Sequence, residues 1–432
     1  MSPIFSQPCR TCSRRRFLQI GSTGVLGIGL ADLLRAQSAM PRPNARATGM
    51  IFIWLGGGPA TIDMWDPKPN APREIRGEFQ PIATSIPGVQ FSELMSRTAK
   101  ILDRSVLVRS LAHNIPDHGP GAQYVMTGNK PSAALEHPSI GSLAASLLPG
   151  SAGMPAYFTI GQSAYTGAGF LGAEHDPFRI ASSRFKATYD LEGVVLPPNM
   201  TRQQFEARRR LSDVVNGEFV RRHEGADIVP TLSKFQQDAH DILTSNRIGK
   251  AFDIATEPES IRKMYGEGEL GRNVLVARRL IEAGARFVTI GTEGWDTHAN
   301  NFDALRGLVP PLDQALAALV TDLEERGRLR ETLVVCGGEF GRTPQINPQA
   351  GRDHWSRAMS FFLAGGGLKA GYVHGSADDK GLDPIDGGCS PDDLAATLLS
   401  LFGFEPNHQV HTTAGRPIEL FEYGKEIKEL IA

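Results

Sequence analysis

An acidic and an imidazole side chain that suit a metal ion follow one predicted strand. Residues 286–291 are a short run rich in β-branched and apolar side chains, which is typical of a buried strand. Asp296 and His298 come directly after this run, two positions apart, so in an extended segment both point to the same side. Together they suit one metal ion. The alternative is a loop aspartate that caps the next helix and a surface histidine.

Two other predicted strands end in the same way. The run 332–337 is followed by glycines, Glu339 and Arg342, and the run 50–55 by three glycines and Asp63. Loops at the carboxyl ends of strands in an open α/β sheet meet at one edge, where binding sites form. We therefore expect Glu339 beside Asp296 and His298, and Asp63 as well if its loop folds back. The alternative for the Asp63 segment is a simple turn.

Further imidazoles lie in two loops. His113 and His118 flank Asp117 in a Gly- and Pro-rich loop that follows the predicted strand 105–111, and such loops carry sites on rigid scaffolds. His354 precedes another apolar run, 359–364. The loop with His113, Asp117 and His118 is therefore a second cluster of candidate ligands.

Strands and helices alternate along the chain. Besides the strands above, the pattern predicts a strand at 156–160 and helices at 138–148, 273–283, 392–402 and from residue 301 onward. The helix after Asn301 places five leucines on one stripe, which we take as core: Leu308, Leu312, Leu316, Leu319 and Leu323. Residues 201–271 have helical patterning and charge, which indicates a helical insertion. The fold class predicted is a three-layer α/β/α domain with a mainly parallel sheet.

The amino terminus has the pattern of an export signal. Arg14, Arg15 and Arg16 precede a short apolar stretch and small residues, as in twin-arginine signals. We predict a signal at residues 1–39, a linker at 40–47 and one domain at 48–432, exported to the periplasm or the cell exterior. The apolar stretch is too short for a stable membrane span once the signal is cleaved, although a retained anchor is the alternative.

The amino-acid composition argues against some classes of binding partner. The formal net charge is -2, with acidic and basic residues interspersed, which gives no case for a nucleic acid or an anionic surface. Cys336 and Cys389 remain after cleavage, and the sequence leaves open whether they are free thiols or one disulfide. It also leaves the oligomeric state open.

The order of these elements resembles the alkaline phosphatase and sulfatase superfamily, and more closely an exported twin-arginine family of unknown function grouped with the sulfatases. Residues 293–300 are similar to the Asp-to-His motif of the superfamily's first metal, and Asp353-His354 to its distal His motif. Residues 127–130, Thr-Gly-Asn-Lys, resemble the end of its nucleophile helix. The resemblance implies a metal-dependent hydrolase of phosphate or sulfate esters.

The chain also departs from that superfamily. His118 stands nine residues before Thr127, where the superfamily has a Ser, Thr or Cys nucleophile. Phe340 replaces an imidazole ligand of the second metal, and glycines replace the acid after the first strand. What remains is one site built from Asp296, His298 and His354, with Glu339 and Asp63 as further ligands.

The chemistry expected is hydrolysis by activated water. A divalent ion, zinc or manganese, in this site lowers the pKa of water and polarises a phosphoryl or sulfuryl oxygen. His118 then acts as general acid, general base or ligand, and Arg342 neutralises an oxyanion. The substrate is a small-molecule or glycan ester. The alternatives are an exported binding or scaffold module that has lost catalysis, and a metal-dependent isomerase or transferase of the same fold.

Overall fold

The computed structural model describes residues 45–151, 153–162, 165–182, 189, 191, 196, 199–211, 239–405, 408–420 and 423–432. The predicted signal at 1–39 lies outside the described residues, as do positions 40–44 of the predicted linker and 212–238 of the predicted helical insertion. Within the described part of the insertion, residues 202–211 and 239–245 are helical. No helix among the described residues is long and apolar enough to cross a membrane.

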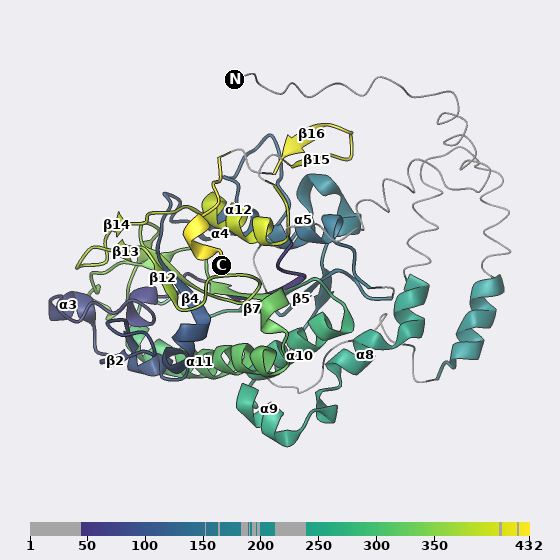
Figure 1. Ribbon diagram of the computed structural model, residues 1–432, viewed down its shortest axis with the longest axis horizontal. Helices are drawn as coiled ribbons and strands as arrows, with labels where there is room; N and C mark the ends of the chain where they lie inside the picture. The colour runs from purple at the N-terminus through teal and green to yellow at the C-terminus, as the bar shows by residue number, and fades with distance from the viewer. Residues whose placement is uncertain are drawn as a thin grey trace, which may run out of the picture. The chain divides into compact units, whose positions relative to one another are not determined.

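An eight-stranded sheet forms the centre of the domain, in the order β12-β4-β11-β8-β1-β7-β5-β6 (Figure 1). Its strands are β1 (Gly49–Leu55), β4 (Ser105–Leu111), β5 (Tyr157–Ile160), β6 (Phe178–Ile180), β7 (Phe287–Thr292), β8 (Thr332–Gly337), β11 (Met359–Ala364) and β12 (Tyr372–His374). All described neighbours pair in parallel except β11, which is antiparallel to β4 and to β8. The predicted mainly parallel sheet is confirmed.

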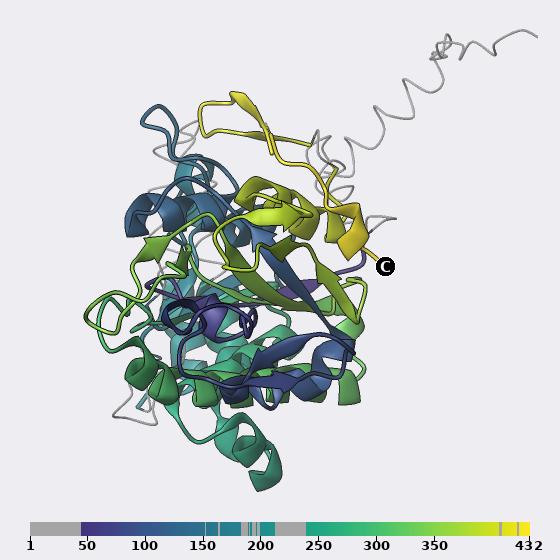
Figure 2. The ribbon, with the colours of Figure 1, turned by 90° about the vertical axis from the view of Figure 1, so that its left-hand side faces the viewer.

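Helices cover both faces of the sheet. They are α3 (Arg73–Arg76), α4 (His118–Thr127), α5 (Ile140–Leu147), α8 (Arg247–Phe252), α9 (Glu259–Tyr265), α10 (Glu269–Ala283), α11 (Asn301–Glu325) and α12 (Pro391–Leu401). In Figures 1 and 2, α10 and α11 lie along one face and α4, α5 and α12 along the other. The predicted three-layer α/β/α fold is confirmed.

Alternation along β1 explains the two layers of core. Ile51, Ile53 and Leu55 belong to the cluster that contains the α10 and α11 side chains, whereas Met50, Phe52 and Trp54 belong to the cluster with α4, α5 and α12. Successive side chains of a strand point to opposite faces, so a strand apolar at every position requires cover on both sides. Of the predicted leucine stripe on α11, Leu312, Leu316, Leu319 and Leu323 are fully buried, and Leu308 is half-buried.

Four short antiparallel strand pairs lie outside the central sheet among the described residues. They are β2 (Pro81–Ala83) with β3 (Gln90–Ser92), β9 (Gly341–Arg342) with β10 (His354–Trp355), β13 (Ser376–Ala377) with β14 (Pro384–Asp386), and β15 (Gln409–His411) with β16 (Pro417–Glu419). The β9–β10 pair carries Arg342 and His354, two of the predicted site residues. Because β11 runs against its neighbours, its first residue lies near the carboxyl end of β4, and β10, just before it, is at the same edge.

The two ends of the described domain meet at the opposite edge. Arg46 and Ala47, ahead of β1, donate backbone hydrogen bonds to the Leu401 carbonyl, and the Arg46 guanidinium donates to the carbonyl of Ala432. Cys336 and Cys389 are both buried and free, which answers the disulfide question that the sequence left open.

Candidate metal centre

Three of the predicted ligands converge at the carboxyl edge of the sheet. Asp296 follows β7, His298 lies two residues on, and His354 begins β10. The Nε2 atoms of His298 and His354 are 3.0 Å apart, and they lie 3.0 Å and 3.3 Å from Oδ1 of Asp296. The structure thus brings together side chains from two segments 56 residues apart in sequence.

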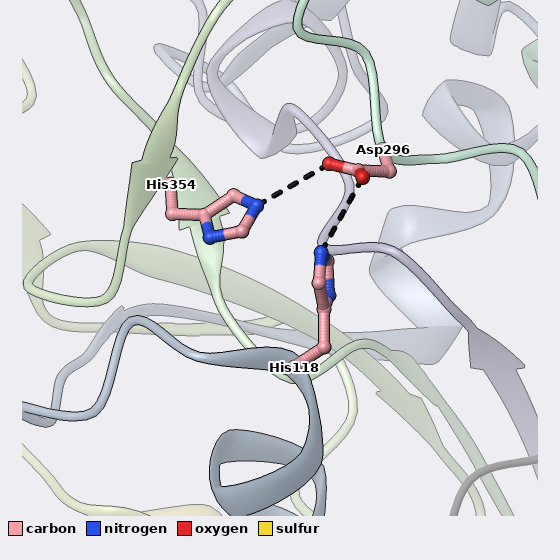
Figure 3. A group of neighbouring side chains, drawn as sticks. All are labelled: His118, Asp296 and His354. Atoms are coloured by element: carbon pink, nitrogen blue, oxygen red, sulfur yellow. Dashed lines mark hydrogen bonds and ion pairs between the residues drawn. The ribbon is translucent and has the colours of Figure 1, made fainter.

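His118 joins this group from the other side of Asp296. It is the first residue of α4, and its Nε2 lies 3.4 Å from Oδ2 of Asp296. The ligand atoms of His118, Asp296 and His354 all lie within 4.8 Å of one another, and Figure 3 shows both imidazoles pointing at the carboxylate. We call His118, Asp296, His298 and His354 the histidine–aspartate cluster.

The outer nitrogens of two imidazoles fix their tautomers. Nδ1 of His354 is 2.7 Å from the carbonyl oxygen of Pro116, which accepts only, so Nδ1 must carry a proton. Nδ1 of His298 is 2.7 Å from Oδ1 of Asp353, which likewise favours a proton there. In the neutral imidazoles, therefore, both Nε2 atoms present lone pairs to each other and to Asp296. Three electron-pair donors this close repel unless a metal ion or a proton lies among them.

The spacing of the donors also fits a metal ion. Zinc binds histidine nitrogen and carboxylate oxygen at about 2.0–2.2 Å, which in a tetrahedral arrangement puts two ligand atoms about 3.3 Å apart. The observed distances of 3.0, 3.0 and 3.3 Å within the cluster lie close to that value. Outer hydrogen bonds to a carboxylate and a backbone carbonyl are the usual support of metal-bound histidine. The donor set therefore fits a divalent ion.

The cluster is open to solvent on one side and rigid on the other. The side chains of Asp296 and His298 are 45% and 46% exposed, whereas Arg342, behind Asp296, is 0% exposed. Arg342 donates to Oδ1 of Asp296 and to the carbonyls of Gly57 and Gly58. Ligands held from behind and exposed in front leave room for a substrate.

Charge in the cluster is set by Arg342 and the imidazoles. Burial alone would raise the pKa of Asp296, but the hydrogen bond and charge of Arg342, with further contributions from His354 and His298, hold that pKa below its ordinary value. The hydrogen bond from His298 likewise lowers the pKa of Asp353. Both carboxylates are thus ionised at neutral pH.

Glu339 lies behind His118 and differs from the other predicted ligands. Its side chain is 3% exposed, and Oε1 lies 2.7 Å from Nδ1 of His118 and accepts a 2.8 Å hydrogen bond from the Gly57 amide. Oε2 is buried without a hydrogen-bond partner among the described residues. The carboxylate orients His118 so that its Nε2 faces Asp296.

The structure does not bring Asp63 to the cluster. Its carboxylate is buried and accepts hydrogen bonds from Arg352 at 2.7 and 2.8 Å and from Asn301 at 2.8 Å. Because both oxygens of Asp63 already accept hydrogen bonds, the carboxylate has no free position for a metal ion. Arg342 is also displaced from its expected place, because its guanidinium faces Asp296 and backbone carbonyls rather than the solvent where an oxyanion would lie.

Sequence reasoning missed the roles of Phe340 and Asp353. Phe340 is fully buried, and its ring centroid lies 4.5 Å from that of His354 and 5.1 Å from that of His118, so it packs both imidazoles in place. Gly58, at φ +74°, admits this ring, because a Cβ there would lie 2.4 Å from it. The acid of the Asp353-His354 pair was the available signal for a partner to His298.

Comparisons with known proteins come in three kinds. A family model described as "Protein of unknown function (DUF1501)" matches residues 47–431. No curated protein matches the chain. Solved structures that match include an alkaline phosphatase and several sulfatases.

The alkaline phosphatase is that of the Antarctic bacterium TAB5, with 10% identity, a TM-score of 0.36 and coverage of 84% of this chain and 99% of that one. The sulfatase PsFucS1 from Pseudoalteromonas sp. has 12% identity, a TM-score of 0.36 and coverage of 90% and 72%. A protein of glycosaminoglycan metabolism in Bacteroides thetaiotaomicron has 13% identity, a TM-score of 0.38 and coverage of 83% and 73%.

Proposed function

The chain belongs to the DUF1501 family of proteins of unknown function, and we propose that it is an exported, metal-dependent hydrolase of phosphate or sulfate esters. One observation carries the proposal. The Nε2 atoms of His298 and His354 and Oδ1 of Asp296 lie 3.0–3.3 Å apart, with both Nδ1 atoms held by acceptors. Three electron-pair donors aimed at one another, half-exposed at the carboxyl edge of an α/β sheet, would hold a metal ion and leave one side of it open.

Each residue of the cluster has a part in this chemistry. A divalent ion, zinc or manganese, would supply the Lewis acidity that polarises an ester and activates water at neutral pH. Asp296, His298 and His354 hold the ion. Arg342 keeps Asp296 in position rather than touching the substrate. His118, oriented by Glu339, either completes the ligand set or moves a proton at Nε2.

Elemental analysis of the purified, secreted protein tests the proposal, and its mass reports whether residues 1–39 have been removed. We expect about one equivalent of zinc or manganese in the wild type and almost none in a His298→Ala, His354→Ala variant. With the ion bound, the wild type should hydrolyse 4-nitrophenyl phosphate or sulfate and the double variant should not. Retention of metal in His118→Ala with loss of turnover would assign His118 to proton transfer.

The alternative of a binding or scaffold module has its own signature. No bound transition metal in either protein, with thermal stability unchanged when divalent ions are supplied, would contradict the hydrolase. A metal that is present and required for stability but gives no turnover would favour a structural ion.

A further inference from the structure

A large hollow lies at the same edge of the sheet as the histidine–aspartate cluster. It has a volume of about 1090 Å³ and lies at the carboxyl ends of β7, β5 and β6, between the start of α10 and the first half of α11. Residues 291–295 line the hollow and Asp296 follows them directly in the chain, although none of the four cluster residues belongs to the lining. A group bound against residues 291–295 therefore lies at the segment that ends in Asp296.

Four glycines form part of the wall of the hollow, and at one of them the missing side chain leaves open space. Gly291, Gly294, Gly161 and Gly307 all line the hollow. Gly307 is inside α11, and a Cβ there would meet nothing within 4 Å. Glycine in a helix interior is less favourable than alanine, and nothing in the packing around Gly307 requires it. Its presence keeps the hollow wide.

The polar groups of the hollow suit hydroxyl groups. Gln162 and Glu293 are exposed, and neither has a hydrogen-bond partner among the described residues. Ser182 donates to Glu269 at 2.8 Å and accepts from Asn273 at 3.3 Å, so this acid and amide are already fixed in place. Amides and carboxylates arranged in this way donate to and accept from alcohols.

The apolar and charged groups of the lining narrow the class of ligand that fits the hollow. Ile180, Leu308 and Pro311 give the hollow an apolar surface beside its polar groups, as a ring with both C–H and O–H faces requires. Glu269 and Glu293 outnumber Arg179, the one basic residue of the described lining, which donates to Thr166 at 2.9 Å. This balance opposes a second negative charge in the bound group.

We propose that this hollow binds the alcohol part of the ester, and that this part is an uncharged, polyhydroxylated ring such as a neutral sugar. The assignment of this group as the alcohol part of an ester rests on the proposed function. Binding itself does not, because the hollow holds the ring whether or not the cluster turns over an ester.

Ligand-observed saturation-transfer NMR tests the proposal with three uncharged disaccharides, maltose, cellobiose and N,N′-diacetylchitobiose. At least one should bind the metal-loaded wild type. Gly307→Leu fills the hollow without touching the cluster, so affinity should fall tenfold or more while the metal content stays unchanged. Glu325→Leu, an exposed position in the last turn of the same helix, is the matched control and should bind as the wild type does.

A second variant protects the test against misfolding. Gln162→Ala removes only an exposed amide, and it should weaken the same disaccharide severalfold. The proposal is overturned if no disaccharide binds the wild type, if Gly307→Leu binds as well as the wild type, or if a glucuronate-containing disaccharide binds more tightly than the neutral ones. Binding without metal or turnover would leave the hollow as a sugar site and reject the hydrolase alone.

Discussion

Asp63 and Asp296 are two aspartates near the ends of adjacent elements of one sheet edge, and the structure treats them in opposite ways. Asp63 is buried and closed, because Arg352 and Asn301 occupy both of its oxygens. Asp296 is half-exposed and faces three imidazoles, with Arg342 bound from behind. The difference shows that residue type and place along a strand do not decide whether a carboxylate binds a metal. What decides is whether other side chains occupy both carboxylate oxygens: Arg352 and Asn301 do so at the buried Asp63, whereas Arg342 binds only Oδ1 of the half-exposed Asp296.

The largest effect expected from this comparison is on stability at Asp63. Asp63→Asn leaves the buried guanidinium of Arg352 without its counter-charge, and breaking a buried pair in this way costs about 3–5 kcal/mol of unfolding free energy. Urea unfolding of the metal-free protein measures this loss. Asp296→Asn, at an exposed position, should lose far less, and an equal loss in both variants would break the comparison.

The next effect is on metal affinity at Asp353. Its side chain is 54% exposed and accepts a hydrogen bond from Nδ1 of His298. Asp353→Ala should weaken metal binding by about 10–100-fold, as removal of an outer partner of metal-bound histidine does, and leave the stability of the metal-free protein nearly unchanged. Competition with a chelator gives the affinity, with Asp379→Ala, an exposed loop acid, as control. Unchanged affinity would mean that Asp353 does not hold His298.

The smallest effect is the pH dependence of stability that comes from Asp296. Its folded pKa is depressed, so it contributes stability above the ordinary carboxyl pKa of about 4 and loses that contribution as the pH falls below it. Solvent screening keeps the contribution within about 1 kcal/mol. In the metal-free protein, the difference in unfolding free energy between wild type and Asp296→Asn should shrink from pH 5 to pH 3. If the difference grew as the pH fell over this range, the pKa of Asp296 would be raised in the folded protein rather than lowered.

The fold could be predicted from the sequence because the patterns that specify its strands and helices are local. Continuous apolar runs such as 50–55 and 332–337 predict strands buried on both faces, and the leucine stripe of α11 predicts a helix packed on the sheet. Asp296 and His298 were predicted as ligands from their place after a strand, and His354 from the resemblance to a known superfamily. Their convergence follows from the sheet, which brings β7 and β10 to one edge.

The hydrogen-bond and packing partners of the site residues could not be predicted from the sequence, because contacts between distant parts of the chain determine them. Nothing near Asp63 in the chain shows that Arg352, 289 residues away, will pair with it. In the same way, the sequence does not show why three glycines follow β1, whereas the structure shows that Gly58 makes room for the ring of Phe340. Phe340 was noted as a lost ligand, and the structure adds that it packs against the imidazoles of the cluster.

Joining both ends of the described domain at one edge has a practical consequence. Arg46 and Ala432 meet beside the start of β1, and the cluster and the hollow lie at the far ends of the same strands. A resin, a display scaffold or an additional module joined at either end would thus approach from the side away from the cluster. Immobilised forms of the protein should keep their open face free, so the domain suits recombination with other modules without redesign of its site.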